Sequence, residues 1–279
     1  MNSTGKSFLQ KLLVNKVSYT LLKPLVYIGE RLKASRENFL DASTTADLEE
    51  QVRAIFSDEM VKHGPFKGMQ FSLKAAGDSL SYSKLLGSYE AEIHPFIVAA
   101  AKKRYDEVVN IGCHDGYYAV GMARLMPETR IKAFDTDTDA HVKTKALAER
   151  NGVAAQMAYG GTYTAADVLK TDDNLRSFFM VDCEGAEKEI FTSNNAKQLR
   201  NADLVIELHL HIHHDLVEYF KGLFEETHDI QIVDSVDDHL KAMQYDYPEL
   251  KDKSYGLKRY ILQERPTFMQ WIFISAKSN

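Results

Sequence analysis

Several side chains that could carry acid–base chemistry follow short apolar runs in the sequence. Asp182 ends the run Phe178–Asp182, and Glu207 and His209 end the run that begins at Asp203. A neutral imidazole titrates near working pH, so His209 is a candidate general base that takes a proton from a hydroxyl group. Asp182 or Glu207 would orient this imidazole or act in its place.

The same residue types leave other interpretations open. His209, His211 and His213 alternate, which on a strand places all three on one face. Imidazoles and carboxylates gathered there could bind a divalent metal. We favour instead a polar strand end that runs into solvent, so no metal is assigned. Asp182, for its part, could simply cap the helix that follows it.

A second group of residues has the spacing of a nucleotide-type site. Glu107–Ile111 is a β-rich apolar run, Gly112–Gly116 is a glycine turn, and the residues after it follow helical spacing. The backbone N–H groups of such a turn can hold a charged ligand at the carboxyl edge of a strand. Asp135 ends a second apolar run, Ile131–Asp135, at the distance from the turn where a carboxylate usually binds a ribose diol.

Two ligand classes fit this spacing, a dinucleotide and S-adenosylmethionine. A dinucleotide site favours the compact pattern G-x-G-x-x-G, whereas the turn here reads Gly112-Cys113-His114-Asp115-Gly116. A histidine and an aspartate in the loop suit a zwitterionic sulfonium ligand better than a doubly anionic pyrophosphate. We therefore expect S-adenosylmethionine, with NAD as the alternative.

The composition is that of an ordinary globular chain. It has 279 residues, a net charge of −6 and two cysteines, which lack metal-type spacing. The negative charge gives no reason to expect nucleic acid, and the few cysteines indicate a reducing compartment. No apolar run reaches the roughly 18 residues of a membrane span, and no secretory signal is evident. The expected location is therefore cytoplasmic.

The first forty residues are basic and carry apolar residues at helical spacing up to Pro24. We expect a helical extension over residues 1–60 that packs on its own domain or on a second subunit. The alternative is a basic amphipathic helix that lies on a membrane surface. A short β-like connecting segment, 61–84, then leads into the main domain, 85–279.

The rest of the chain alternates strand-like runs with helical spacing. The expected strands are Glu107–Ile111, Ile131–Asp135, Ala154–Ala158, Phe178–Asp182, Asp203–Ile212, Ile230–Val236 and Met269–Ala276. This alternation predicts an α/β fold, a Rossmann-like seven-stranded and mostly parallel sheet with helices on both faces. Only the last link, Asp237–Phe268, lacks an obvious crossover helix.

Over roughly residues 60–279 the sequence resembles the FkbM-type class I S-adenosylmethionine-dependent methyltransferases. The stretches that carry the resemblance are GPFKGM, KLLGSYEAE, VNIGCHDGYY, AFDTD, VDCEGAE, VIELH and ERPTFMQW. The resemblance implies methyl transfer to a hydroxyl, often on a sugar, glycan or natural product, while the fold alone specifies no acceptor. Two positions depart from the family pattern. Asn110 stands where the family usually has aspartate, and Asp135-Thr136 stands where it usually has Glu-Pro.

We therefore predict an O-methyltransferase that acts on a small molecule or glycan. The residues expected at the acceptor are Asp182, Glu207 and His209. Those expected at the cofactor are Glu90, Asn110, Gly112, Cys113, Asp115, Tyr117, Asp135, Thr136, Gly160, Gly161 and Asp182. Glu90 or Asp115 would supply the charge for the methionine ammonium group. Two alternatives remain open, an NAD-dependent oxidoreductase and a non-catalytic partner protein in which Asn110 marks a decayed site.

Overall fold

The computed structural model describes residues 46–72, 80–264 and 268–277. The chain divides into two compact units, Met1–Ala54 and Ile55–Asn279. Of the first unit only residues 46–54 are described, and they belong to a helix over 46–55. The helices predicted before residue 46 lie outside the described residues.

The second unit is built on a seven-stranded sheet with the strand order β3-β2-β1-β4-β5-β7-β6. The strands are β1 (Glu107–Ile111), β2 (Arg130–Phe134), β3 (Met157–Gly160), β4 (Ser177–Val181), β5 (Asp203–Leu208), β6 (His228–Asp234) and β7 (Gln270–Ala276). Strands β1 to β5 pair in parallel, and β7 runs antiparallel to both of its neighbours. This order, with an antiparallel β7, is that of the class I methyltransferase type of Rossmann-like fold, which confirms the predicted fold class.

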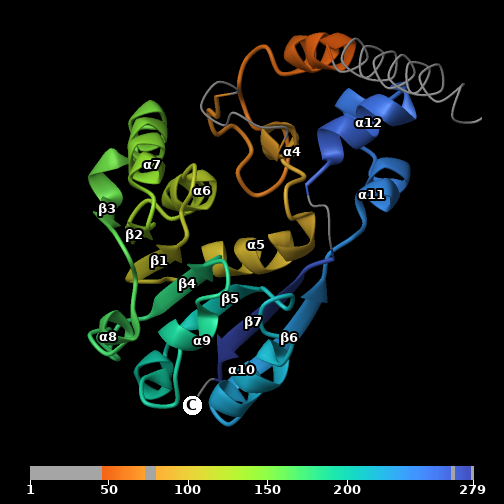
Figure 1. Ribbon diagram of the computed structural model, residues 1–279. Helices are drawn as coiled ribbons and strands as arrows, with labels where there is room; N and C mark the ends of the chain where they lie inside the picture. Colours follow the sequence, from red (N-terminus) through yellow and green to blue (C-terminus); the bar gives the residue numbers. More distant parts are fainter. Residues whose placement is uncertain (1–45, 73–79, 265–267, 278–279) are drawn as a thin grey trace, which may run out of the picture. The chain divides into compact units, whose positions relative to one another are not determined.

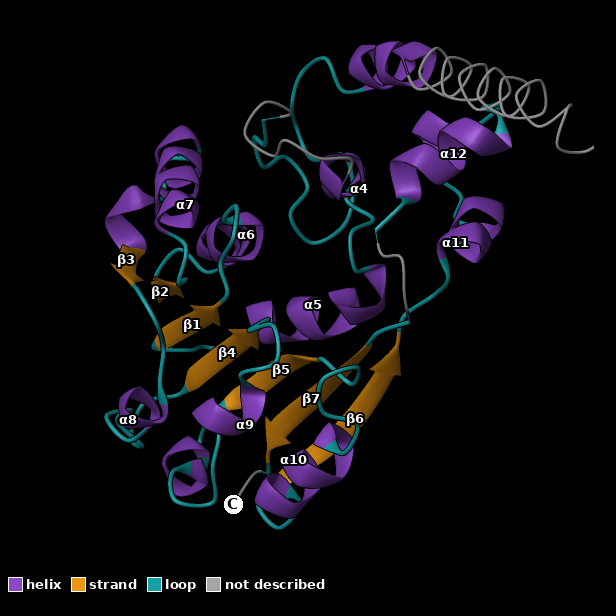
Figure 2. Ribbon diagram, viewed as in Figure 1, coloured by secondary structure: helices purple, strands orange, loops and turns teal. Residues whose placement is uncertain are grey.

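Helices cover both faces of the sheet (Figures 1 and 2). The α-helices are α4 (Leu80–Leu86), α5 (His94–Lys102), α6 (Tyr117–Leu125), α7 (Thr138–Arg150), α8 (Ala165–Val168), α9 (Glu187–Ile190), α10 (Leu216–Phe224), α11 (Asp238–Gln244) and α12 (Tyr255–Leu262). The short 3-10 helices are η1 (Ala91–Ile93), η2 (Ala154–Gln156), η3 (Ala196–Leu199) and η4 (Pro248–Leu250). In the view of Figure 1, α5, α6 and α7 lie on one side of the sheet and α8, α9 and α10 on the other.

The central strands form the core because both of their faces are covered. Every residue of β1, β4 and β5 is buried, as expected for parallel strands that read as continuous apolar runs. On one face, Phe179 and Leu204 pack in a cluster with Phe191 and Phe220. The carboxyl ends of these strands are therefore held rigidly, and the candidate polar residues follow them.

Two of the predicted strands require correction. The fifth strand ends at Leu208 rather than Ile212, because the backbone turns there: the N–H of Ile212 donates to the carbonyl oxygen of His209 at 2.9 Å. Residues 154–156, predicted as strand, form η2, and β3 begins only at Met157. The last link, predicted without an obvious crossover helix, contains the short helices α11 and α12 and leads into the antiparallel strand β7.

Local capping explains the two helices of the last link. The Asp237 side chain accepts from the backbone N–H of His239 at the start of α11, and the Ser254 hydroxyl accepts from that of Leu257 at the start of α12. Both residue types are favoured at helix N-caps. In the connecting segment predicted as β-like, 61–84, Gln70 forms an antiparallel bridge with Met60, which lies just before the segment. The last residues of the segment enter α4.

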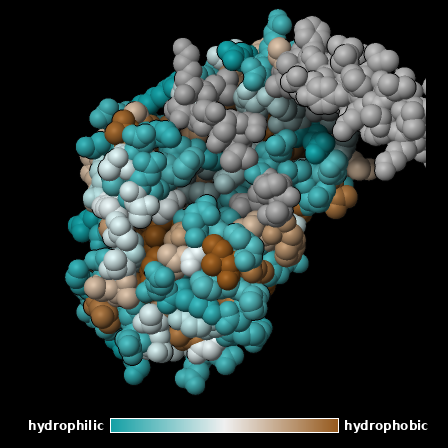
Figure 3. Space-filling model, in the orientation of Figure 1, coloured by the Kyte–Doolittle hydropathy of each residue, from teal (hydrophilic) through white to brown (hydrophobic). Residues whose placement is uncertain are grey.

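The surface of the described part is mainly hydrophilic on the face shown in Figure 3, where apolar residues form small patches. Exposed large apolar side chains include Met243 and Phe268. Within the described ranges, no helix has both the length and the apolar character needed to cross a bilayer.

Candidate active site

The glycine turn after β1 brings three strand ends together. Gly112 has a φ of 77°, and a Cβ atom there would lie 1.7 Å from the carbonyl oxygen of Asp182, so only glycine fits. The N–H groups of Gly112 and Cys113 both donate to the carbonyl oxygen of Phe134, at 2.9 and 3.0 Å. The ends of β1, β2 and β4 therefore meet at this turn.

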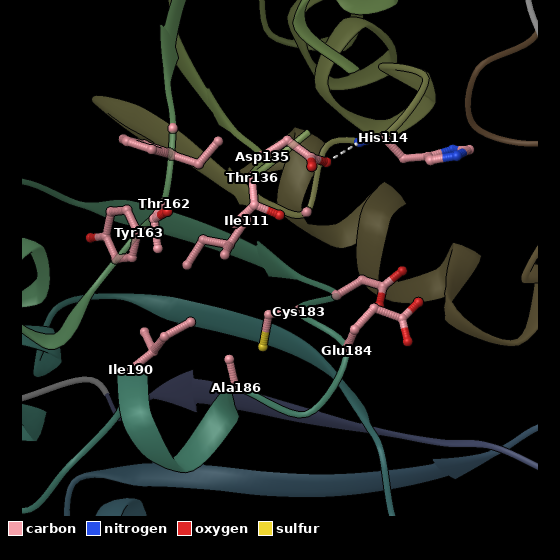
Figure 4. A pocket seen from close by; sticks show the side chains of 14 residues that line it. Ile111, His114, Asp135, Thr136, Thr162, Tyr163, Cys183, Glu184, Ala186 and Ile190 are labelled. Carbon is pink, nitrogen blue, oxygen red and sulfur yellow. Dashed lines mark hydrogen bonds between the residues drawn. The ribbon is translucent and has the colours of Figure 1, made fainter. Parts of the chain in front are cut away.

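Asp135 closes the same turn from the β2 side. One of its carboxylate oxygens accepts from the backbone N–H of His114 at 2.8 Å, and the other accepts from that of Asp137 at 2.9 Å. The first of these bonds is drawn in Figure 4. A carboxylate offers about four lone-pair positions, so Asp135 can still accept hydrogen bonds from a ligand.

A first cavity, called cavity A here, has a volume of about 260 Å³ and lies beside Asp135. Its polar edge includes Asp135 and Thr136, and its apolar wall includes Tyr163, Ala186 and Ile190. Figure 4 shows Ala186 and Ile190 across the cavity from the two polar residues. An apolar wall opposite a hydrogen-bonding carboxylate suits a flat heterocycle joined to a diol.

A second cavity, called cavity B, has a volume of about 470 Å³ and lies next to the first. The two cavities share Gly112, His114, Asp182 and Glu184. Cavity B is also lined by Asn110, Tyr117, Glu207 and His209. One ligand can therefore extend from cavity A past the glycine turn into cavity B.

His209 is buried in the wall of cavity B and is held by a second buried residue. Its Nδ1 atom lies 2.5 Å from Oε1 of Glu187, which opens α9 and is fully buried. Burial works against the imidazolium form, but the hydrogen bond to Glu187 and the nearby carboxylates outweigh it and raise the pKa of His209. For Glu187, burial alone would raise the pKa, but the hydrogen bond with His209 outweighs this effect, and the pKa of the Glu187 carboxyl is lowered.

Three side chains from two strand ends form one cluster in cavity B. One ligand atom each of Asp182, Glu207 and His209 lies within 4.8 Å of the others. The Nε2 atom of His209 is 3.5 Å from Oδ1 of Asp182 and 3.4 Å from a carboxylate oxygen of Glu184. Burial, together with the charge of Glu207, raises the pKa of Asp182 well above its usual range.

A buried ion pair forms another wall of cavity B. Lys84 Nζ lies 2.5 Å from Oδ2 of Asp115, and the ammonium group faces the rings of Tyr89 and Tyr117. Burial alone would raise the pKa of Asp115, but the charge of Lys84 outweighs it and holds the pKa well below its usual range. Lys84 thus supplies a positive charge beside the glycine turn.

Asn110, which also lines cavity B, has a buried acceptor atom without a partner among the described residues. Its Nδ2 atom donates to the carbonyl oxygen of Met180 at 3.2 Å. Its Oδ1 atom is buried and accepts no hydrogen bond from the described residues. Because a buried polar atom without a partner is costly, a donor supplied by a ligand would stabilise this arrangement.

The link between β6 and β7 contributes Glu264 to the wall of cavity B. Lys241, which is also buried, lies 2.6 Å from Oε2 of Glu264 and 3.1 Å from a carboxylate oxygen of Glu92. Two carboxylates thus share one ammonium group. Burial raises the pKa of Glu264 to about 8, although the charge of Lys241 acts in the opposite direction.

The structure brings most of the predicted residues to the two cavities. Of the predicted cofactor residues, Gly112, Asp135, Thr136, Gly161 and Asp182 line cavity A, and Asn110, Gly112, Cys113, Asp115, Tyr117 and Asp182 line cavity B. The predicted acceptor residues Asp182, Glu207 and His209 all line cavity B. Burial raises the pKa of the Cys113 thiol to about 11, so this residue is a neutral part of the wall.

Glu90 and Gly160, in contrast to the prediction, line neither cavity. The Tyr118 hydroxyl donates to the carboxylate of Glu90, and the backbone N–H of Glu90 donates to Glu264 at 3.1 Å. A Cβ atom at Gly160 would lie 2.2 Å from the ring of Phe134, so this glycine allows close packing of β3 on that ring. Both residues lie behind the walls of the site.

Sequence reasoning missed Lys84, Glu187 and Glu264 as site residues. Lys84 and Glu187 belong to the stretches KLLGSYEAE and VDCEGAE, which were singled out for other residues. Their partners lie 31 and 22 positions further along the chain. Glu264 lies in the link between β6 and β7 and opens the stretch ERPTFMQW, which was quoted without a role for this residue. Only the tertiary structure identifies these three.

Comparisons with known proteins give a likeness of fold only. No protein-family model matches the chain, and no curated protein sequence matches it.

Among solved structures, the chain resembles the O-methyltransferase TomG from Streptomyces achromogenes, which was solved in complex with S-adenosylmethionine. The two sequences are 13% identical. The match covers 81% of this chain and 96% of TomG, with a TM-score of 0.46. An rRNA methylase from Streptococcus thermophilus is 14% identical, with 67% and 97% covered and a TM-score of 0.45. Precorrin-6y C5,15-methyltransferase from Geobacter metallireducens is 14% identical, with 66% and 87% covered and a TM-score of 0.42. The fold assignment accordingly stands on the strand order of the chain itself, which is of the class I methyltransferase type.

Proposed function

We propose that this protein is an S-adenosylmethionine-dependent methyltransferase that methylates an oxygen of its acceptor. The observation that carries the proposal is the pair of adjacent cavities at the carboxyl ends of β1, β2 and β4, with Asp135 at the edge of cavity A. Ligands of doubly wound sheets bind at this edge. The adenosine half would occupy cavity A and the methionine half would enter cavity B.

Cavity A has the groups that an adenosine needs. Asp135 retains lone pairs for a ribose diol, because backbone N–H groups use only part of its capacity. The rings and alkyl groups of Tyr163 and Ile190 offer the apolar contact that an adenine base prefers.

Cavity B suits the methionine half. The unused Oδ1 atom of Asn110 can accept from an ammonium group even though Asn110 carries no charge. Lys84 is paired with Asp115, but its ammonium group has three donors and can also donate to the ligand carboxylate. The carboxylates of Asp182 and Glu207 favour a positively charged sulfonium nearby. This charge pattern fits S-adenosylmethionine better than the doubly anionic pyrophosphate of NAD.

Methyl transfer is an in-line displacement at the sulfonium carbon, so the protein mainly aligns the acceptor and helps to remove its proton. Asp182, Glu207 and His209 lie together at the acceptor side of cavity B and are the groups able to bring about that proton loss. The resemblance to FkbM-type enzymes favours a hydroxyl on a sugar, glycan or natural product as the acceptor.

The test is methyl transfer from labelled S-adenosylmethionine to a panel of sugars, glycans and phenols, with S-adenosylhomocysteine as the second product. His209→Ala should lower kcat by at least about 100-fold, the scale of a lost proton-transfer group. Its affinity for S-adenosylhomocysteine should stay within about threefold, because His209 does not line cavity A.

His213→Ala is the matched control, since it removes the same side chain from a position outside both cavities. It should leave kcat unchanged. Equal loss of activity in both variants, or full activity of His209→Ala, would contradict the assignment of the acceptor side.

A further inference from the structure

The cluster of Asp182, Glu207 and His209 has the dimensions of a metal site. The separation of 3.5 Å between His209 Nε2 and Asp182 Oδ1 is long for a hydrogen bond. Two ligands bound to one tetrahedral cation at about 2.1 Å lie about 3.4 Å apart. All three ligand atoms lie within 4.8 Å of one another, so one ion can reach them after small side-chain movements.

Glu187 provides a second, independent observation. It is fully buried, and its carboxylate holds Nδ1 of His209 at 2.5 Å. With the Nδ1 proton donated to Glu187, the lone pair of Nε2 points toward the carboxylate of Asp182. Metal-binding histidines usually have such a carboxylate partner on the other ring nitrogen, which fixes the tautomer and the ring orientation.

The charge of cavity B also calls for a cation. Its lining includes the carboxylates of Asp182, Glu184 and Glu207. Glu264 also lines it, but Lys241 is paired with that carboxylate. Lys84 does not balance the other three, because it is already paired with Asp115. Oδ1 of Asp182 is buried and accepts no hydrogen bond from the described residues. S-adenosylmethionine would bring only one net positive charge against the carboxylates of Asp182 and Glu207.

We propose that Asp182, Glu207 and His209 bind a divalent cation, with Glu187 as the positioning residue. Two carboxylates and one imidazole suit borderline ions such as Mn²⁺ or Zn²⁺. The remaining coordination positions face cavity B and would bind the acceptor through its hydroxyl oxygen. The identity of the acceptor as a hydroxyl compound rests on the proposed function, whereas the cation site does not.

The cation would assist the transfer by lowering the pKa of the bound hydroxyl. The hydroxyl proton passes to water, the O–CH₃ bond forms and the S–CH₃ bond breaks. The products are a methyl ether and S-adenosylhomocysteine. In this arrangement the Nε2 lone pair of His209 would bind the cation rather than the hydroxyl proton. His209→Ala should lose activity whether His209 acts as a metal ligand or as the base.

Titration of the full-length protein with MnCl₂ alone, followed by calorimetry and by the electron paramagnetic resonance signal of unbound Mn²⁺, tests the site. The wild type should bind one Mn²⁺ per chain. The isosteric variants Asp182→Asn and Glu207→Gln should bind at least tenfold more weakly, since each removes one ligand charge. Glu187→Gln should weaken binding by about 10- to 100-fold, the usual effect of losing a partner of a ligating histidine.

Glu184→Gln is the matched control. The carboxylate that it removes lies 3.4 Å from His209 Nε2, but the Glu184 side chain is largely exposed. Its Mn²⁺ affinity should stay within about threefold of the wild type, and circular dichroism should show that all variants are folded. Absence of Mn²⁺ binding at millimolar concentration, or equal weakening in Glu184→Gln, would overturn the proposal.

A separate titration of the metal-free wild type with S-adenosylhomocysteine distinguishes the two proposals. Cofactor binding without Mn²⁺ binding would refute only the cation site. Mn²⁺ binding without cofactor binding would refute only the methyltransferase assignment.

Discussion

Nδ1 of His209 lies 2.5 Å from Oε1 of Glu187, and both side chains are buried. Glu187 opens α9 after β4, whereas His209 follows β5, so the contact joins the segments that follow two neighbouring strands. Since the hydrogen bond fixes the orientation of the imidazole, Nε2 is presented to cavity B. The orientation of the imidazole in cavity B therefore depends on a residue that does not itself line the cavity.

Asp135→Ala should weaken binding of S-adenosylhomocysteine by about 10- to 100-fold, the scale of hydrogen bonds to a charged group. The variant loses the proposed ribose contact and also the bond that holds His114 in the glycine turn. Calorimetric titration measures the affinity. Asp137→Ala is the control. It removes the N-cap of α7, which costs about 1 kcal/mol of stability. Its affinity for S-adenosylhomocysteine should be unchanged, because Asp137 lines neither cavity. Unchanged affinity of Asp135→Ala would refute the placement of the ribose.

Gly112→Ala should fail to fold or lose several kcal/mol of stability, because its Cβ would collide with the carbonyl oxygen of Asp182 at a positive φ. Urea unfolding followed by circular dichroism measures the effect. In Gly222→Ala, a Cβ within α10 would have no atom within 4 Å. This control should gain roughly 0.5–1 kcal/mol from helix propensity. Similar stability of the two variants would contradict the described turn.

Asp115→Asn should destabilise the protein at pH 7 by about 3 kcal/mol, because Lys84 would remain buried without its partner. The pKa of Asp115 is depressed in the folded state. Its stabilising contribution is therefore complete above the unfolded pKa of about 4 and is lost as the pH falls through the folded pKa. The variant should show a flatter acid limb of the unfolding free energy plotted against pH.

A double variant, Lys84→Met with Asp115→Asn, separates the charge from the shape of this site. It should recover part of the lost stability, because no unpaired charge remains. An acid limb as steep in Asp115→Asn as in the wild type would contradict the depressed pKa.

The sequence predicted those elements whose signal is local. The strand Glu107–Ile111 was predicted with the bounds that β1 has in the structure, and the helical spacing after Gly116 corresponds to α6. A continuous apolar run and a helical apolar face are visible within a few residues. The strand-end carboxylates Asp135 and Asp182 follow from the same reasoning, because the ends of parallel strands meet at one edge of the sheet.

Other features depend on tertiary contacts and could not be read in this way. Ile212 prolongs the apolar alternation after β5, yet the backbone already turns at His209. The helices α11 and α12 are short, and only their caps, Asp237 and Ser254, give a local signal. Glu187 looks like an ordinary charge in the first turn of a helix until its partner, 22 positions later, is placed beside it.

The most direct test of the central claim is thermal unfolding of the wild type with S-adenosylmethionine, S-adenosylhomocysteine or NAD. A ligand at about a hundred times its dissociation constant adds about 2.7 kcal/mol to the free energy of unfolding, which raises the midpoint by several degrees. We predict such a shift with the two adenosyl compounds and none with NAD. A shift with NAD alone would indicate an oxidoreductase, and no shift with any of the three would contradict the methyltransferase assignment and favour a non-catalytic protein.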